Sequence, residues 1–533
     1  MKAKLTVAFV SFQEFENLGI GYLRSVLEKE GYRTIIIDIN SDKRQILEIL
    51  RTENPAIVGF SIIYQYYIER FRDVIGFLRK YNINSHFTGG GHFASLKTND
   101  LFQILPWLDS IVRFEGEYTM LELANCIASG KDWKKVKGLA YRGTDNKVIL
   151  NPLRTPVSDL DEYPFPVRSE IKRFVFDRFY ANIIAGRGCR YNCAFCNMSK
   201  FYSHPGWKLK RTRHPKLVVD EIQKLYLDNN CSVFLFEDDD FPVSGRDGSN
   251  WVKEFCNELS QRGLSRKVSW KINCRADEID EDIFGLMKNS GLFLVFVGIE
   301  DGTNEGLKNF NKGTTVKKMS EGINKLKKLR IGLDYGFILF HPLTTFGSLR
   351  KNLNYLLQTF SDGTSPISYL RLNPYYETRI EQYLINTGRL KGIPSNQTYD
   401  FIEPALDSFY EFTSNSFGSW LNDPDGFVNI SKWARNHFLI ASGEFPAVSS
   451  TQLSWDTLNS IISEGNSYLI NTLLDLAGLF ENEKKRPSYT ILKKYKSEIA
   501  RKHNRLVNRV EYHMSDFLLD VIEHYPGQIS YCT

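Results

Sequence analysis

The chain of 533 residues has few cysteines and no long apolar run. Its eight cysteines are too few for a disulfide scaffold, so we expect a reducing, cytoplasmic location. No stretch approaches the roughly 20 apolar residues that a membrane span needs, and the first residues lack the cleavage site of a signal peptide. A net charge of +6 is small for this length. We therefore expect neither a membrane nor a nucleic acid as a partner.

The composition favours well-packed globular domains. Hydrophobic residues make up 42% and charged residues 24% of the chain, which is enough apolar material for real cores. At roughly 150 residues per domain, the length predicts three to four domains. Residues 1–150 alternate between short apolar strands and amphipathic helices, a pattern typical of a parallel sheet covered on both faces. Ligands of such sheets bind beyond the carboxyl ends of the strands, here near Ser61 and residues 89–92.

The rest of the chain divides into three parts. Residues 151–180 carry four prolines and predict a linker or strap. A second strand–helix series over residues 181–394 predicts an open or partial α/β barrel with its chemistry at the strand carboxyl ends. From about residue 395 the pattern becomes helical. The strands expected in the second series are residues 182–185, 233–236, 268–272, 293–297, 333–339 and 369–372.

Three of the eight cysteines fall within eight residues, directly after the first strand of the second series: Cys189, Cys193 and Cys196. An odd, crowded trio is poorly suited to disulfides, and a zinc site would need a fourth ligand nearby. Three thiolates on a [4Fe–4S] cluster leave one iron without a protein ligand, and that iron can bind a small chelating cofactor. The trio therefore indicates an iron–sulfur site rather than buried thiols or structural zinc.

The spacing Cys189-x3-Cys193-x2-Cys196, with an aromatic residue before the last cysteine, resembles the signature of the radical SAM superfamily. Further segments are similar, in order, to landmarks of the branch with an N-terminal cobalamin-binding domain; these are residues 211–221, 236–241, 275–279 and 298–302. The resemblance covers residues 1–380. It implies an α/β protein with four parts: a Rossmann-like cobalamin-binding domain (1–150), a linker (151–180), a radical SAM partial (β/α)6 barrel (181–394) and a helical C-terminal domain (395–533).

The resemblance also implies how the barrel binds S-adenosylmethionine (SAM). In that superfamily the open iron takes the amino and carboxylate groups of SAM, and an electron from the cluster cleaves SAM to a 5′-deoxyadenosyl radical. Asp238 and Asp239 would hold the ammonium group. Glu300 would accept hydrogen bonds from the ribose, and Arg275 would pair with a carboxylate or with neighbouring acids. For each acid taken alone, a solvated loop charge is the alternative.

For cobalamin, the resemblance concerns two loops of the N-terminal domain. Ser61 would contact the nucleotide tail, and the run Gly89, Gly90 and Gly91 would let the phosphate of the tail approach the backbone. A tight turn that serves only packing is the alternative for the glycines. One motif of the branch is missing: residues 13–17 read Gln-Glu-Phe-Glu-Asn, where Asp-x-His-x-x-Gly would supply a lower-axial histidine. Bound cobalamin would therefore lack that ligand.

The remaining cysteines are weaker candidates. We expect Cys126, Cys231, Cys256 and Cys274 to be packing thiols. Cys532, next to the last residue, could donate a hydrogen atom to a substrate radical, with an idle tail thiol as the alternative. No further group of cysteines follows residue 196, which argues against enzymes with auxiliary clusters.

Together these features favour a radical SAM enzyme that uses a [4Fe–4S] cluster, SAM and cobalamin to methylate an unactivated carbon in a natural-product or peptide substrate. Its electron donor would be a flavodoxin or ferredoxin. The alternative is a cobalamin-independent epimerase, deoxygenase or cyclase that acts by hydrogen-atom abstraction. A third reading, an iron–sulfur redox sensor without turnover, does not explain the ordered landmarks at Asp238, Arg275 and Glu300.

Overall fold

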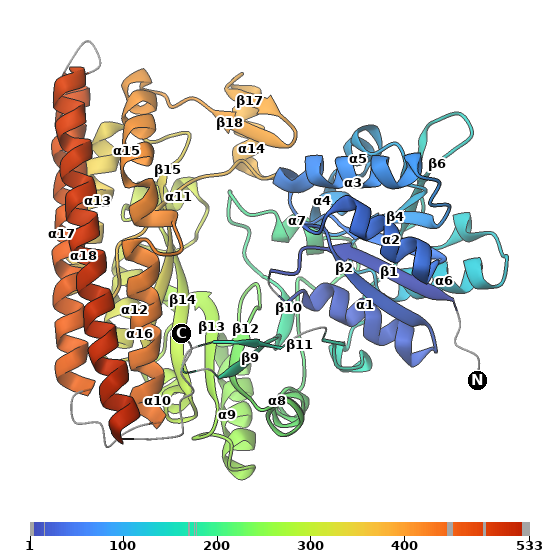
Figure 1. Cartoon of the computed structure of the whole chain (residues 1–533), viewed down its shortest axis with the longest axis horizontal. Helices are drawn as coiled ribbons and strands as arrows, with labels where there is room; N and C mark the ends of the chain where they lie inside the picture. Colours follow the sequence, from blue (N-terminus) through green and yellow to red (C-terminus); the bar gives the residue numbers. More distant parts are fainter. Residues whose placement is uncertain are drawn as a thin grey trace.

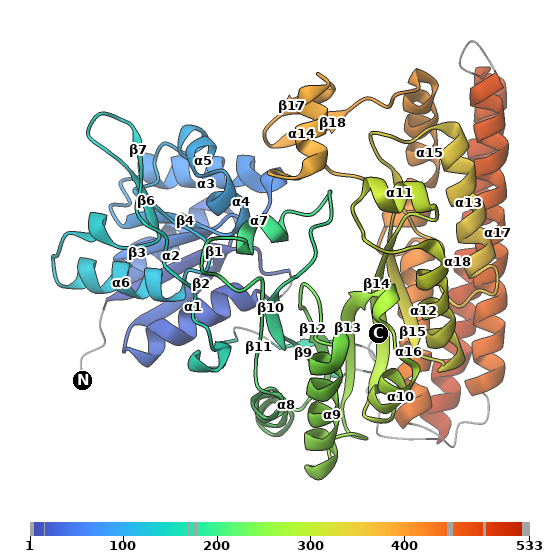
Figure 2. The ribbon, with the colours of Figure 1, turned by 180° about the vertical axis from the view of Figure 1, so that it is seen from behind.

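Two α/β sheets and a set of long C-terminal helices build the molecule (Figure 1). The computed structural model describes residues 5–14, 16–168, 171–174, 176, 178–444, 451–482 and 487–524. Seen from behind, the N-terminal domain lies at one end and the C-terminal helices at the other, with the second sheet between them (Figure 2). No helix in the described ranges has the length and apolar character to cross a membrane.

The N-terminal sheet has seven strands in the order β2-β1-β3-β4-β5-β6-β7. Its first five strands are parallel, and β6 and β7 add an antiparallel edge. Separate apolar cores cover the two faces, one formed with α2, α3 and α5 and the other with α1 and α6. This confirms the parallel sheet predicted from its fully apolar strands. The bounds are β1 (Thr6–Ser11), α1 (Leu18–Lys29), β2 (Arg33–Asp38), α2 (Lys43–Glu53), β3 (Ile57–Ser61), η1 (Gln65–Tyr67), α3 (Ile68–Lys80), β4 (His86–Gly90), α4 (His92–Leu96), α5 (Thr98–Ile104), β5 (Ser110–Val112), α6 (Glu117–Ala128), β6 (Leu139–Arg142) and β7 (Val148–Leu150).

The second sheet is an open, curled half-barrel in the order β16-β15-β14-β13-β12-β9-β8. Six of its strands, from β9 to β16, are parallel, and β8 pairs antiparallel with β9. Six strand–helix units were expected, and the sheet confirms the partial barrel. The bounds are β8 (Lys172–Arg173), β9 (Phe179–Ile183), β10 (Gly186–Gly188), α7 (Met198–Tyr202), β11 (Lys210–Thr212), α8 (Pro215–Asn229), β12 (Cys231–Phe236), α9 (Gly245–Gln261), β13 (Ser269–Arg275), α10 (Glu281–Asn289), β14 (Leu292–Glu300), α11 (Asn304–Asn309), α12 (Val316–Lys328), β15 (Gly332–Phe340), α13 (Phe346–Phe360), β16 (Leu370–Arg371) and α14 (Arg379–Asn386).

Local signals set where the barrel helices begin and end. Pro215 occupies the first turn of α8, where its missing N–H costs nothing, and Asn230 ends that helix in the left-handed conformation. Thr345 caps α13 in a reciprocal bond with Ser348. The neighbouring sequence therefore already specifies these boundaries.

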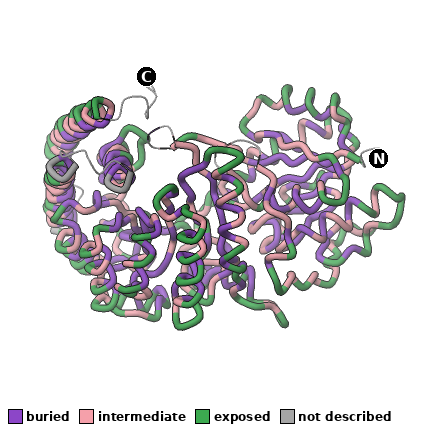
Figure 3. Tube along the Cα trace, turned by 90° about the horizontal axis from the view of Figure 1, so that it is seen from below, coloured by how far each residue is buried: buried purple, intermediate pink, exposed green. Residues whose placement is uncertain are grey.

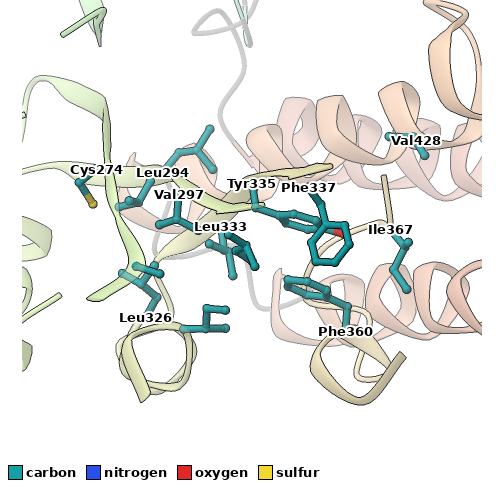
Figure 4. Close-up of a cluster of buried hydrophobic side chains, with 14 of the residues drawn as sticks. Cys274, Leu294, Val297, Leu326, Leu333, Tyr335, Phe337, Phe360, Ile367 and Val428 are labelled. Atoms are coloured by element: carbon teal, nitrogen blue, oxygen red, sulfur yellow. The ribbon is translucent and has the colours of Figure 1, made fainter. Parts of the chain in front are cut away.

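The C-terminal helices are α15 (Pro404–Asn422), α16 (Phe427–Glu444), α17 (Thr451–Asn482) and α18 (Tyr489–His524). They share one continuous apolar core with the barrel. Figure 4 shows Tyr335 of β15 beside Phe360 of α13, with the two rings stacked 4.3 Å apart, and Val428 of α16 belongs to the same core. Buried residues occur both in the half-barrel and in the C-terminal helices (Figure 3).

Two expected segment boundaries fall inside structural elements. The segment 151–180 contains β8 and the first residues of β9, and its Leu160 and Tyr163 are buried in a small core beside Tyr22. The hairpin β17 (Leu390–Ile393) and β18 (Asn396–Tyr399) spans residue 395, so the helical part begins at Pro404. Proline and glycine in the sequence predict turns, but they do not predict which residues of a connecting segment pack against a domain, so the two boundaries were misplaced.

Tyr376, in the loop between β16 and α14, completes the core of the N-terminal domain. It is 5% exposed and belongs to the same apolar cluster as β3, β4 and α3. Its ring lies 5.0 Å from that of Phe93, and its hydroxyl donates to the carbonyl of Pro394 at 2.5 Å. Beside it Lys97 pairs with Glu377 at 2.9 Å. The second sheet thus contributes a core residue to the first domain.

Replacing Arg435 by alanine should strongly destabilise the junction between the barrel and α16. Its guanidinium is fully buried, donates to the carbonyl of Leu333 at 2.9 Å and pairs with Asp334. Burial would raise the pKa of Asp334, but the charge and hydrogen bond of Arg435, together with the charges of Lys432 and Lys271, lower it. Loss of the partner leaves a buried charge unpaired, which costs about 3–5 kcal/mol. Urea unfolding should show the loss.

The matched control is Arg350→Ala, which removes a more exposed pair with Glu481. This change should cost no more than about 1 kcal/mol. Equal losses of unfolding free energy in the two variants would show that the buried Arg435–Asp334 pair stabilises the protein no more than the exposed pair does.

Candidate active site

The three cysteines lie on one loop between β10 and α7. All three are free and half-buried. Burial raises the pKa of Cys189 to about 12 and that of Cys196 to about 11, and it also raises the pKa of Cys193. Without a metal these thiols stay protonated near neutral pH; bound iron would remove the protons, because metals bind the thiolate.

Contacts from two other elements hold this loop in place. The backbone N–H of Ala194 donates to the carbonyl of Phe310 at 2.8 Å, and its carbonyl accepts from the N–H of Ile380 at 3.1 Å. The rings of Phe195 and Phe310 are 5.3 Å apart, edge to face. Gly188, just before the first cysteine, has φ +86°, and a side chain there would collide with the carbonyl of Leu209.

The donor set fits an iron–sulfur cluster better than a single metal ion. In the described part of the chain, no three His, Cys, Asp or Glu side chains lie close enough to hold one ion. An iron–sulfur cluster needs a different arrangement of ligands, because each thiolate binds its own iron and the sulfurs need not converge on one point. Three free thiols on one anchored loop provide that arrangement and leave the fourth iron without a protein ligand.

Asp238 and Asp239 follow β12, and both are tied to the strand end and loop that precede the cysteines. Asp238 accepts from the N–H of Ala185 at 3.0 Å, and Asp239 from that of Gly188 at 3.0 Å. Burial raises the pKa of Asp238 to about 8 and that of Asp239 to about 6. One oxygen of Asp238 is buried without a partner. A bound ammonium group would satisfy such carboxylates.

Arg275, at the end of β13, is largely occupied by protein groups. It binds both oxygens of Asp277, at 3.0 and 3.1 Å, and donates to the carbonyl of Lys312 at 2.6 Å. Its guanidinium lies 4.0 Å from the ring centre of Tyr191 on the cysteine loop. Its Nη1 is buried without a partner. The geometry therefore supports a role in positioning the cysteine loop, with one donor left for a ligand.

Glu300, at the end of β14, lies in the left-handed region with φ +69°. Its carboxylate folds back over two glycines that are paired in register, Gly298 and Gly336. A side chain on Gly336 would come within 3.2 Å of one carboxylate oxygen, so both glycines leave room for the acid. The unusual backbone at Glu300 therefore directs its carboxylate across the inner face of the sheet.

Sequence reasoning missed Lys312, which pairs with Glu300 at 3.1 Å and is only 5% exposed. Burial raises the pKa of Cys193, whereas the charge of Lys312 lowers it, which places the ammonium beside the cluster loop. No spacing marks this residue as a buried lysine among the polar residues after β14. Lys312 is buried because the chain after α11 runs back across the carboxyl ends of the barrel strands.

A cavity of roughly 320 Å³ lies at the carboxyl ends of the N-terminal strands. Ser61, Gly90 and Gly91 line it, with Ser61 and Gly90 paired in register. Gly91 has φ +104°, and a side chain there would come within 2.8 Å of the carbonyl of Ile62. Gly89 does not line the cavity, because its Cβ position points towards Leu108 in the core.

The same cavity reaches the barrel, because Arg187, Met198 and Asp239 also line it. It therefore joins the glycine loop of one domain to the flanks of the cysteine loop of the other. Among the residues expected at the SAM site, Asp239 lines it, whereas Asp238, Arg275 and Glu300 do not. Cys532 lies outside the described residues.

Buried ion pairs fix the two domains around this cavity. Arg187 pairs with Glu117 at 2.7 Å and with Glu115 at 3.2 Å, and Arg211 also pairs with Glu115. These four side chains are at most 12% exposed. Since Arg187 lies two residues before Cys189, the pairs also set where the cysteine loop begins.

The segment that would carry an axial histidine connects the domains instead. Glu16 pairs with Arg168 and accepts from the N–H of Asn182 at 2.8 Å, while Asn17 caps α1. The cavity is lined by a different histidine, His92, whose Nε2 is buried without a partner. Burial lowers the pKa of His92 to about 4, so the imidazole is neutral. A corrinoid tail bound in this cavity would contact the unpartnered Nε2 of His92 and the glycine loop.

Comparisons with known proteins match both domains. A B12 binding domain model matches residues 5–124, and a radical SAM superfamily model matches residues 183–354. An anaerobic magnesium-protoporphyrin IX monomethyl ester cyclase from Rubrivivax gelatinosus is 31% identical over 60% of this chain and 58% of its own. A hopanoid C-3 methylase from Methylococcus capsulatus is 24% identical over 60% of each chain. The chain spans a little more than half the length of the cyclases.

Solved structures show the same fold. The cobalamin-dependent S-adenosylmethionine radical enzyme OxsB, with aqua-cobalamin bound, aligns over 97% of this chain and 84% of its own, with a TM-score of 0.69 and 17% identity. The radical S-adenosylmethionine methyltransferase TsrM from Kitasatospora setae, with cobalamin and a [4Fe–4S] cluster, aligns over 72% and 78%, with a TM-score of 0.62 and 18% identity.

Replacing any of the three loop cysteines by alanine should abolish the iron–sulfur absorption of the anaerobically reconstituted protein. Each thiolate would hold one iron, so no variant can complete the site. The control is Cys274→Ala, which removes a buried thiol at the end of β13 and should keep full iron content. Retention of the cluster in a loop variant would contradict the assignment.

Gly91→Ala should lower the corrinoid content of the purified protein severalfold. The change adds a methyl group at a positive φ and against the carbonyl of Ile62. Gly130→Ala is a matched control, because Gly130 also has a positive φ but nothing lies within 4 Å of the added carbon. Alanine at Gly130, with φ +64°, should cost about 1 kcal/mol, whereas Gly91, with φ +104° and ψ −179°, occupies a backbone region open almost only to glycine, so only Gly91→Ala should release corrinoid. Equal corrinoid content in both would contradict a cofactor role for the glycine loop.

Proposed function

Since the chain belongs to the radical SAM superfamily and carries an N-terminal B12-binding domain, we propose that it is a cobalamin-dependent methyltransferase that acts on an unactivated carbon. The observation that carries the proposal is the shared cavity, which is lined by Gly90 and Gly91 of one domain and by Asp239 and Arg187 of the other. A methyl donor and a radical generator can serve one substrate only when both open onto the same space.

When bound, SAM and the reduced cluster would supply a radical that removes a hydrogen atom from the substrate, and cobalamin would supply the methyl group. The chain itself binds, orients and excludes water. Cys189, Cys193 and Cys196 would hold three irons of the cluster. Asp239, whose carboxylate faces the cavity, would accept the ammonium of SAM. Lys312 and Glu300, paired beside the loop, would meet its remaining polar groups.

The apolar wall of the cavity would protect reactive species from water. Phe60, Val112, Phe114 and Phe201 line it, together with the buried ring of Tyr202. Apolar side chains of this kind keep mobile water away from a reactive species.

Tyrosines from both domains border the cluster loop and would contact the substrate. Tyr64 and Tyr67 are 49% and 46% exposed. The ring of Tyr66 lies 6.2 Å from that of Tyr375, which follows β16. Burial raises the pKa of Tyr64 and of Tyr375; Asp239 contributes to the first shift and Cys196 to the second, which places both rings near the site. We propose a small-molecule or peptide substrate with an apolar or aromatic part.

Two observations favour a second candidate. The Rubrivivax relative, at 31% identity, is a cyclase, and residues 13–17 carry no axial histidine. A radical enzyme that abstracts hydrogen atoms without transferring a methyl group would also fit these two facts.

The two candidates separate when the protein is purified anaerobically from cobalamin-supplied cells and reconstituted with iron and sulfide. Methyl transfer predicts about one corrinoid per chain and the formation of both S-adenosylhomocysteine and 5′-deoxyadenosine under reductant. A cluster and 5′-deoxyadenosine without corrinoid would support the second candidate. Absence of SAM cleavage would support a redox sensor.

Within this experiment, Asp239→Asn should keep the cluster but lower the rate of SAM cleavage at least about tenfold, the cost of one charge-assisted hydrogen bond. Asp247→Asn, an exposed acid at the start of α9, should leave the rate unchanged.

A further inference from the structure

The inner face of the half-barrel carries an aromatic ring that the protein leaves exposed. On β14, Val295 and Val297 face the helices and are fully buried, whereas Phe296 between them is 37% exposed. The strand is paired on one side with β13 and on the other with β15, so the ring is exposed through the inner face of the sheet. A ring in this position is available to a ligand.

A buried ion pair and two lysines lie beside Phe296. Asp334 of β15 is opposite Phe296 in register and pairs with Arg435 of α16. The charges of Lys271 and Lys432 also lower the pKa of Asp334, which places both ammonium groups near its carboxylate. Lys271 belongs to β13, whereas Lys432 lies on α16, three residues before Arg435 and therefore on the same side of the helix.

Neither lysine has its hydrogen-bonding capacity satisfied by the protein. Lys271 shares the face of Asn273, the register partner of Phe296, because alternate residues of a strand point to one side. Its ammonium is 3.5 Å from Glu237, too far for a strong hydrogen bond, and the side chain is only 19% exposed. Lys432 forms no ion pair with a residue in the described ranges. Ammonium groups partly withdrawn from water favour an anion as a ligand.

This part of the inner face adjoins the shared cavity. Glu237, the acid beside Lys271, also lines the cavity. Phe296 lies four residues before Glu300 on β14, which corresponds to about 13 Å along the strand. Between them on this face is Gly298, which has no side chain. A molecule that contacts Phe296 can therefore extend along the sheet to the end that carries Glu300.

Helix α16 covers the other end of this face. Gly332, at the start of β15, shares the face of Asp334, and a side chain on Gly332 would come within 2.4 Å of Leu439 on α16. The helix that carries Lys432 therefore covers the amino end of β15. In this way the C-terminal helices contribute a charged side chain to the inner face of the barrel.

We infer that this part of the inner face, defined by Lys271, Phe296 and Lys432, selects the substrate. The two ammonium groups bind an anionic group of the substrate, a carboxylate or a phosphate, and the ring of Phe296 supports an apolar part. The inference rests on the proposed function and adds the class of substrate to it. Contacts at this distance from the reacting carbon would fix which carbon lies in the shared cavity. A cationic substrate would be repelled by the two lysines.

Isothermal titration calorimetry on the reconstituted full chain, without SAM, tests the inference with three probes that share one apolar body. The probes are 2-naphthoate, 2-naphthyl phosphate and the uncharged 2-naphthamide. At least one of the two anions should bind at least about tenfold more tightly than the amide, as expected for one charge-assisted hydrogen bond. A preference for the carboxylate or for the phosphate identifies the anionic group.

Two variants assign the binding to these residues. K271M/K432M should remove the preference for the anions and bind the amide as the wild type does. F296A should weaken the binding of all three probes severalfold, because each loses the same aromatic contact.

The matched control is K317M/K318M, which removes two exposed lysines at the start of α12 and changes the net charge equally. It should keep the preference of the wild type. Equal affinities of the wild type for the anions and the amide would overturn the inference, as would a failure of both anions to bind or a preference that survives in K271M/K432M. Because binding is measured without SAM and without turnover, a failure of the proposed methyl transfer does not affect this result.

Discussion

The relation between the two α/β domains depends on charges buried between them. Arg187 and Arg211 of the barrel pair with Glu115 and Glu117 of the N-terminal domain, almost out of contact with water. Buried pairs of this kind add little net stability, because desolvation offsets their attraction, but a displaced partner leaves a charge uncompensated. They therefore specify one relative orientation. That orientation is what lets a single cavity reach from Gly91 to Asp239.

The loop that lacks the axial histidine has a different function: it holds the two domains together. In this chain the loop after β1 connects the domains through Glu16, Arg168 and the backbone of Asn182. A loop bound at both ends has no freedom to present a ligand beneath a corrin ring. Two buried polar atoms of the cavity lining have no partner among the described residues: Oε2 of Glu117, and Nε2 of His92, which belongs to the glycine loop on the next strand but one of the sheet.

Much of this arrangement could be predicted from the sequence, because its signals are local. Fully apolar strands gave both sheets, and the spacing of Cys189, Cys193 and Cys196 gave the loop. What escaped prediction depends on distant partners. In the sequence Lys312 looks like an ordinary polar loop residue, and only the structure shows that it pairs with Glu300. Gly89 and Gly91 look alike in sequence, but only Gly91 needs a positive φ and lines the cavity. The hairpin β17–β18 has no strong alternation, and its place follows from contacts with the N-terminal domain.

Tyr376 has a consequence for how the protein is made. The core of the N-terminal domain closes around a side chain that the ribosome adds more than two hundred residues after that domain's last strand, β7. Until then the nascent domain exposes an apolar socket beside Phe93, a surface that attracts other chains. The core of the N-terminal domain is therefore complete only after the segment that follows β16 has been synthesised. For the same reason, a B12-binding domain exchanged between relatives must bring its matching segment after β16 with it.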